Sequence, residues 1–99
     1  MIARIWHGRT RADKADDYVS FLRKTGISDY RETQGNLGAY ILQRIEGSEA
    51  HFLTLSFWES LESVKAFAGE DYDKARYYPE DKDFLLEFEP NVLHYEVFE

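Results

Sequence analysis

The chain has 99 residues, and its 19 Asp and Glu outnumber its 12 Lys and Arg, which gives a formal charge of -7 at pH 7. A hydrophobic content of 43%, with 16% aromatic residues, excludes a disordered chain and predicts one packed domain over residues 1–99. The acidic balance disfavours nucleic acid and anionic membranes as partners, because both attract clustered Lys and Arg, and no apolar run approaches the ~20 residues that cross a bilayer.

The first third of the chain predicts a strand followed by helical segments. The segment 2–9 is short and carries the apolar residues Ile2, Ile5 and Trp6 before Gly8, which favours a strand over a helix. Residues 13–24 carry apolar side chains at helical spacing with acidic residues at the start, and Gly26 is expected to end this helix. A further helical turn is expected around residues 27–30, before a turn at 34–36.

The middle of the chain predicts a hairpin and a second helix. Residues 37–45 and 52–58 are β-like, and the connection over residues 46–50 has a length that fits an antiparallel hairpin. Ser60 is a suitable N-cap for a helix whose apolar residues share one face, and Gly69 is expected to end it.

The last quarter of the chain predicts helical segments and one more strand. Residues 72–78 are expected to be helical, Pro79 is expected to begin another helix, and residues 92–98 form a final strand. The acidic stretch 80–83 is interpreted as a solvated helix start. The resulting order, β-α-β-β-α-β, predicts an α+β, ferredoxin-like fold with four antiparallel strands and helices on one face.

The sheet's other face indicates a second copy of the chain. In residues 37–45 and 52–58, apolar side chains occupy both alternating sets of positions, so both faces of these strands need cover. One layer of helices covers one face, and we therefore expect a homodimer in which the second faces pack together. The alternative is a monomer with a partly wet apolar face.

The chain lacks the usual ligands for metals and nucleotides. It has no Cys, which excludes disulfides and thiolate sites and suits a reducing cytoplasm, the expected location. His7, His51 and His94 lie far apart in the sequence with no metal-ligand spacing, and no Gly-rich phosphate loop is present. We expect neither a metal nor a cofactor.

An aromatic and imidazole set is the remaining candidate for a site. The fold brings the segment after the second helix over the sheet, so these side chains can line a cleft between sheet and helices that holds a flat aromatic ligand. The alternative is that the aromatic residues are ordinary core. The set comprises His7, Trp58, Phe67, Tyr72, Arg76, Tyr77 and Tyr78.

Three segments give the chain a resemblance to a known family. They are Leu55-Ser56-Phe57-Trp58-Glu59-Ser60, Phe67, and Asp73-Lys74-Ala75-Arg76-Tyr77. With the element order, they resemble the antibiotic biosynthesis monooxygenase domains of the dimeric α+β barrel superfamily. That family includes cofactor-free oxygenases of phenolic polyketides, quinol-forming enzymes and haem degraders. Haem degraders have Asn, Trp and His where this chain has His7, Phe67 and Tyr77, which disfavours haem degradation.

The resemblance implies cofactor-independent oxidation of a small aromatic or quinol-type substrate. His7 is the expected base, with His94 as a second candidate, because a neutral imidazole suits proton abstraction near pH 7. Tyr77 or Tyr72 would donate a hydrogen bond to the substrate oxygen, and Arg76 would stabilise an oxyanion.

The competing hypothesis is a non-catalytic dimer that binds a small hydrophobic molecule or acts as an interaction module. A cleft filled by Trp58, Phe67 and Tyr77 stacked on one another favours this hypothesis. An open cavity with His7 inside it favours the oxygenase.

Overall fold

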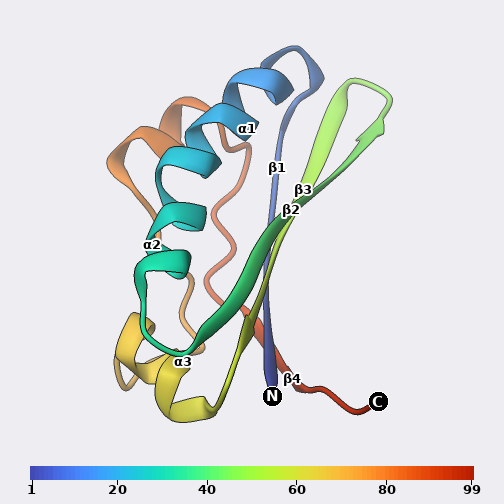
Figure 1. Ribbon diagram of the computed structural model, residues 1–99. Helices are drawn as coiled ribbons and strands as arrows, with labels where there is room; N and C mark the ends of the chain where they lie inside the picture. Colours follow the sequence, from blue (N-terminus) through green and yellow to red (C-terminus); the bar gives the residue numbers. More distant parts are fainter.

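The computed structural model describes residues 1–99 as a four-stranded antiparallel sheet with helices on one side (Figure 1). The strands lie in the order β2-β3-β1-β4, which confirms the predicted ferredoxin-like α+β fold. None of the helices combines the length and hydropathy needed to span a bilayer. The elements are β1 (Ile2–Arg11), η1 (Ala12–Lys14), α1 (Ala15–Lys24), α2 (Gly26–Glu32), β2 (Asn36–Glu46), β3 (Glu49–Trp58), α3 (Leu61–Ala68), η2 (Pro79–Asp83) and β4 (Leu93–Glu96).

The predicted helices over the first third are present, and α1 ends at Lys24 as expected, but the residue that caps it is Thr25 and not Gly26. The Thr25 hydroxyl donates to the carbonyl of Phe21 at 2.8 Å. Gly26 then opens α2 instead of closing α1. The side-chain hydroxyl of Thr25 satisfies a helix-end carbonyl, so the glycine is not needed as a C-cap.

The hairpin is confirmed, with a tighter connection than the sequence suggested. Glu46 pairs with Glu49, which leaves only Gly47 and Ser48 in the turn. Gly47 adopts φ +61°, a conformation that tight two-residue hairpin turns require and that glycine adopts without strain. The strands therefore extend to the turn itself.

Helix α3 begins and ends as predicted. The Ser60 hydroxyl accepts a hydrogen bond from the backbone N–H of Ser63 at 3.3 Å, and Gly69 follows the helix with φ +84°. Ser60 thus accepts from a free backbone N–H at the start of the helix, and Gly69 lets the chain turn away at its end, in a helix of only eight residues.

The prediction of a helix over residues 72–78 is wrong. The backbone N–H of Ala75 donates to the carbonyl of Pro90 at 2.9 Å, and that of Val92 donates to Asp73 at 2.8 Å. The segment is thus held by pairing with a distant part of the chain. Tertiary hydrogen bonds take the place of the helical ones that the apolar spacing suggested.

The last elements are shorter than predicted. Pro79 begins a 3₁₀ helix of five residues, and β4 has four residues where seven were expected. Asp81, interpreted as part of a solvated stretch, is 3% exposed and accepts hydrogen bonds from the Tyr18 hydroxyl and the backbone N–H of Tyr78 at 2.8 and 2.7 Å. It ties η2 to α1 across the molecule.

Two apolar clusters lie between the sheet and the helices. The first joins β1 and β3 to α1, and the second joins the far end of β3 to α2 and α3. Members of both clusters line one small cleft between the sheet and the helices, which therefore lies where the clusters meet. Their largest members are Trp6, Tyr18, Leu22 and Phe52 in the first and Tyr30, Trp58, Ile27 and Val64 in the second.

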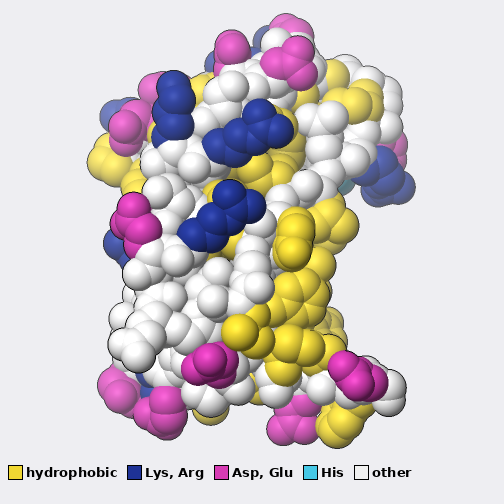
Figure 2. Space-filling view, viewed as in Figure 1, with side chains coloured by type: hydrophobic (Ala, Val, Ile, Leu, Met, Phe, Trp, Pro, Cys, Tyr) yellow, Lys and Arg dark blue, Asp and Glu magenta, His cyan; other side chains and the backbone are white.

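The opposite face of the sheet carries no helix (Figure 1) and is apolar, as the strand pattern predicted. One row of paired residues crosses all four strands, from Tyr40 through Leu55 and Ile5 to Leu93. The ends of this row, Tyr40 and Leu93, are 55% and 58% exposed. Figure 2 shows hydrophobic side chains gathered along the sheet side of the molecule. We call this surface the open face.

Candidate functional site

His7 lies on the open face, so the prediction that it lies in the helix-side cleft is wrong. Its Nδ1 contacts the Glu89 carboxylate, and its Nε2 lies 3.2 Å from Nδ1 of His51. Side chains alternate along a strand, and the neighbouring Trp6 packs against Tyr18 on the helix side. Only one of the two adjacent residues can face the helices, and the larger apolar side chain is buried there.

Arg4 is the charged residue near the start of β1 that faces the helix side of the sheet. It is 1% exposed and lies opposite His94 in the register of β1 and β4. Its Nη1 donates to the backbone carbonyl of Tyr72 at 2.6 Å and lies 3.0 Å from Nε2 of His94. A guanidinium is thereby fixed beneath the segment that follows α3.

His94 is held as a neutral imidazole. Its Nδ1 lies 3.1 Å from Oδ1 of Asp73, while Nε2 faces Arg4. Burial lowers the pKa of His94, and the positive charge of Arg4 lowers it further. With Nδ1–H donating to Asp73, Nε2 carries the lone pair and accepts from Arg4. The sequence left the facing of His94 open, and the structure directs it toward the helices.

Phe67 and Trp58 meet in the cleft as predicted. Their ring centroids are 5.8 Å apart, and Tyr30 lies 4.7 Å from Phe67. The guanidinium carbons of Arg4 and Arg76 lie 5.5 and 5.0 Å from the centroid of the same Phe67 ring. One half-buried aromatic ring therefore contacts two cations.

The two predicted tyrosine donors are placed differently. The ring of Tyr72 packs edge-on against His94, with centroids 5.4 Å apart, so Tyr72 lies at the Arg4 end of the cleft. The Tyr77 hydroxyl donates to the backbone carbonyl of Glu89 at 2.5 Å and lies 3.4 Å from Nε1 of Trp6. Burial raises the pKa of Tyr77. Its proton is already used within the chain.

The cleft is nearly filled by its own side chains. The cavity between sheet and helices has a volume of about 30 Å³, which is too small for an aromatic ring. A ligand therefore requires side chains to move; exposed Arg76 lines the cavity, and half-buried Phe67 lies next to Arg76. The cavity is lined by Trp6, Tyr18, Leu22, Gly26, Tyr30, Thr54, Arg76, Tyr78 and Asp81.

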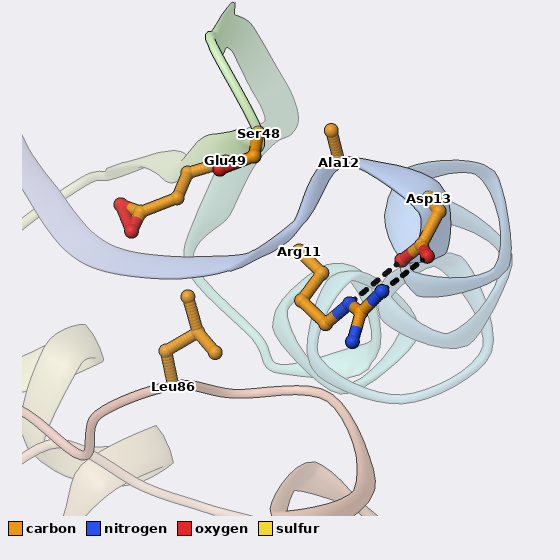
Figure 3. A pocket seen from close by; sticks show the side chains of 6 residues that line it. All are labelled: Arg11, Ala12, Asp13, Ser48, Glu49 and Leu86. Atoms are coloured by element: carbon orange, nitrogen blue, oxygen red, sulfur yellow. Dashed lines mark hydrogen bonds and ion pairs between the residues drawn. The ribbon is translucent and has the colours of Figure 1, made fainter.

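A much larger hollow lies elsewhere and does not resemble a binding site. It measures about 460 Å³ and lies at the end of β1, beside the hairpin turn (Figure 3). Arg11 and Asp13 point toward each other there and form a two-bond ion pair, at 3.2 and 2.8 Å, on exposed side chains. The charges of Arg11 and Asp13, which a ligand would have to use, already neutralise each other and are hydrated.

Arg4, Asp73 and Asp81 are candidate site residues that were not predicted from the sequence. A signal for Arg4 was present, because the alternation that directs Ile2 and Trp6 to one face of β1 also places position 4 there. No comparable signal marks Asp81, whose burial depends on Tyr18 from a distant helix.

Comparison with solved structures identifies the architecture. A candidate antibiotic biosynthesis monooxygenase from Nitrosomonas europaea superposes with a TM-score of 0.67 at 14% identity, covering 100% of both chains. A second candidate of the same kind, from Bacillus cereus, gives 0.65 at 13%, covering 99% of this chain and 95% of the other. This chain has the antibiotic biosynthesis monooxygenase fold. The expected fold resemblance is thereby confirmed.

The same monooxygenase fold includes a haem-degrading relative. The Mycobacterium tuberculosis haem degrader MhuD, solved with two haems bound in its active site, gives a TM-score of 0.59 at 20% identity over 98% of this chain and 95% of that one. No protein-family model matches the chain, and no curated protein matches it. The monooxygenase fold is therefore established by structural similarity alone.

Proposed function

We propose that this chain is a cofactor-independent oxygenase that takes a small, flat, electron-rich aromatic molecule into the helix-side cleft. The observation that carries the proposal is the half-buried neutral imidazole of His94, held between Asp73 and the guanidinium of Arg4. It combines an oriented base with a fixed positive charge, which are the groups that such an oxidation requires.

The chemistry needs only molecular oxygen as co-reactant. For an anthrone, the substrate first displaces Nη1 of Arg4 from Nε2 of His94. Nε2 then takes a proton from the reactive CH₂ carbon, and the resulting anion passes one electron to O₂. The two radicals combine to a peroxide, which takes back the proton. Loss of water, with the remaining hydrogen of that carbon, leaves a new carbonyl group. Anthrone plus O₂ gives anthraquinone plus water.

Each cleft residue has a distinct role in this proposal. Asp73 orients the His94 ring by accepting from Nδ1–H, as the carboxylate does in a base-orienting pair. Arg4 and Arg76 stabilise the negative oxygen of the substrate anion. His94 takes over the role of base that the sequence analysis gave to His7, because His7 lies on the other side of the sheet. Tyr72 forms a wall beside His94.

We also propose that the working form is a homodimer joined through the open face. The row from Tyr40 to Leu93 is long, apolar and without cover, and a twofold axis would pair it with its own copy. The helix-side cleft then faces outward on each subunit. The cytoplasm is the proposed location on composition alone.

The test is oxygen consumption with anthrone, followed with an electrode and by the absorbance of anthraquinone. We expect turnover above the buffer rate, and we expect His94→Asn to lower it at least tenfold. The matched control is His7→Asn, which changes the same side chain on the opposite face of the sheet and should leave the rate unchanged. Turnover that depends on His7 and not on His94 would refute the assignment.

A second function is favoured by the volume of the cleft. With about 30 Å³ enclosed and Trp58 against Phe67, the cleft is filled, as expected for a dimeric module that binds or interacts without catalysis. Aromatic ligands that bind stoichiometrically and are recovered unchanged, with no oxygen consumed, would support this function over the oxygenase.

A further inference from the structure

Arg4 is a buried cation without a carboxylate partner. It is 1% exposed, and none of the eight ion pairs in the structure includes it. Its Nε has no hydrogen-bond partner at all. Buried charges in proteins are normally paired, so a guanidinium in this state indicates a missing anion.

The other arginines of the same strand show the contrast. Arg9 donates two hydrogen bonds from Nη1 to Glu49, at 3.1 and 3.0 Å, and Arg11 makes a two-bond pair with Asp13. Both are far more exposed than Arg4, and water alone would satisfy their charge. The one arginine of β1 that most needs a counter-ion is the one that the chain leaves without it.

The partners that Arg4 does have are neutral and occupy one end of the guanidinium. Nη1 contacts the carbonyl of Tyr72 and Nε2 of His94, and the Phe67 ring lies 5.5 Å from the guanidinium carbon. No hydrogen bond is made by Nε or Nη2. These two N–H groups form the planar edge that binds a carboxylate through two parallel hydrogen bonds.

The surroundings specify the rest of the ligand. Phe67 contacts both guanidiniums and packs on Trp58 and Tyr30, so a ring that displaced it would meet aromatic walls and two positive charges. A flat aromatic ring would complement the aromatic side chains, and a planar anion would complement the unpaired Nε and Nη2 of Arg4.

We infer that the helix-side cleft recognises an aromatic carboxylic acid, whose carboxylate binds Nε and Nη2 of Arg4 and whose ring takes the space now held by Phe67. The inference rests on the proposed function for the location of the site, and it adds the substrate class: an aromatic acid in place of a neutral phenol or quinol. Arg76, at the exposed side of the cleft, supplies a second positive charge during entry.

The probe pair is 2-naphthoate and its uncharged isostere 2-naphthamide, titrated into the full chain by calorimetry. We expect the wild type to bind the carboxylate at least tenfold more tightly than the amide. Arg4→Met keeps the length and packing of the side chain and should abolish this preference. The matched control, Arg9→Met, removes an arginine from the open face of the same strand and should retain it.

Thermal unfolding separates a binding arginine from a structural one. If Arg4 awaits a ligand anion, Arg4→Met relieves an uncompensated buried charge, and its Tm without ligand should equal or exceed that of the wild type. If that variant does not fold, Arg4→Lys, which keeps the charge and loses the planar edge, should reduce the preference at least fivefold. Equal binding of both probes by the wild type overturns the inference, as does a preference that survives either substitution in a folded protein.

The outcome is independent of whether the protein is an oxygenase. Arg4-dependent naphthoate binding without oxygen consumption by any aromatic substrate supports the ligand class and refutes the proposed chemistry. Oxygen consumption with neutral anthrone, with no preference for naphthoate over naphthamide, supports the chemistry and refutes the ligand class.

Discussion

A single charge at the centre of the open face should separate the proposed dimer into monomers. Leu55 lies on the central strand β3, paired with Tyr40 on one side and Ile5 on the other. In the monomer this side chain is half-buried on a face without helices, so Leu55→Asp leaves an acid that water can reach. In the dimer the same acid is buried against its own copy.

The expected loss follows from the area that the row would bury. Complete burial of a Leu side chain contributes about 1.5–3 kcal/mol, and about half of this remains to be gained in the dimer because Leu55 is already half-buried in the monomer. A twofold interface loses this remainder twice, which gives about 1.5–3 kcal/mol. At about 1.4 kcal/mol per tenfold, the dissociation constant should rise by a factor on the order of 10 to 10². Two unpaired buried carboxylates add to this, so the factor is a lower bound.

Sedimentation velocity measures the result directly. We expect the wild type at micromolar concentration to sediment with twice the 11.7 kDa mass of the chain, and Leu55→Asp to sediment as a folded monomer. The control is Ile45→Asp, which places the same acid on an exposed apolar residue of β2 whose partner Ala50 belongs to the helix-side core. A monomeric wild type, or a Leu55→Asp protein that stays dimeric, would refute the open-face dimer.

Three further outcomes are expected from the contacts on the helix side. Tyr18→Phe removes a donor 2.8 Å from the buried Asp81 carboxylate and should lower the free energy of unfolding by about 1–3 kcal/mol in urea titrations; a change below about 0.3 kcal/mol would contradict the role given to this bond. Because the pKa of His94 is lowered in the folded chain, His94 takes up its proton near pH ~6.5 in the unfolded chain and only at lower pH in the folded one. The free energy of unfolding should therefore fall as the pH drops from 7 to 5.5. His94→Gln should flatten that part of the pH profile, and an equally steep profile in this variant would assign the loss to other groups. Haemin should cause no stoichiometric Soret shift, because Tyr77, the residue of this chain at the position where haem degraders have their His ligand, already donates its hydroxyl proton to the carbonyl of Glu89; a sharp shift at one equivalent would restore haem as a ligand.

The sequence predicted those elements whose signals are local. The hairpin, α3 and the element order followed from alternation, from Ser60 and Gly69 at the helix ends, and from the apolar spacing of α1. Residues 72–78 failed because their backbone pairs with residues 90–92, a long-range contact that local spacing does not encode.

The candidate site was predicted in part, because face assignment depends on a single residue of register. Trp58 packs against Phe67 and Tyr72 packs against His94, and Arg4 contacts a member of each pair. His7 was predicted on the wrong face of the sheet. Alternate residues of a strand face opposite sides, and a histidine is compatible with either side, so its identity does not show which side the helices cover. The position of Arg4 could be inferred from its alternation with Trp6, but the absence of its counter-ion emerges only in three dimensions.

A crystal structure of the chain grown with 2-naphthoate would show whether Arg4 binds an aromatic acid on the helix side. We expect the carboxylate within hydrogen-bond distance of Nε and Nη2 of Arg4, the Phe67 ring displaced from Trp58, and Nε2 of His94 facing the bound ring. Naphthoate bound on the open face beside His7 and His51, with Phe67 still packed against Trp58, would contradict it.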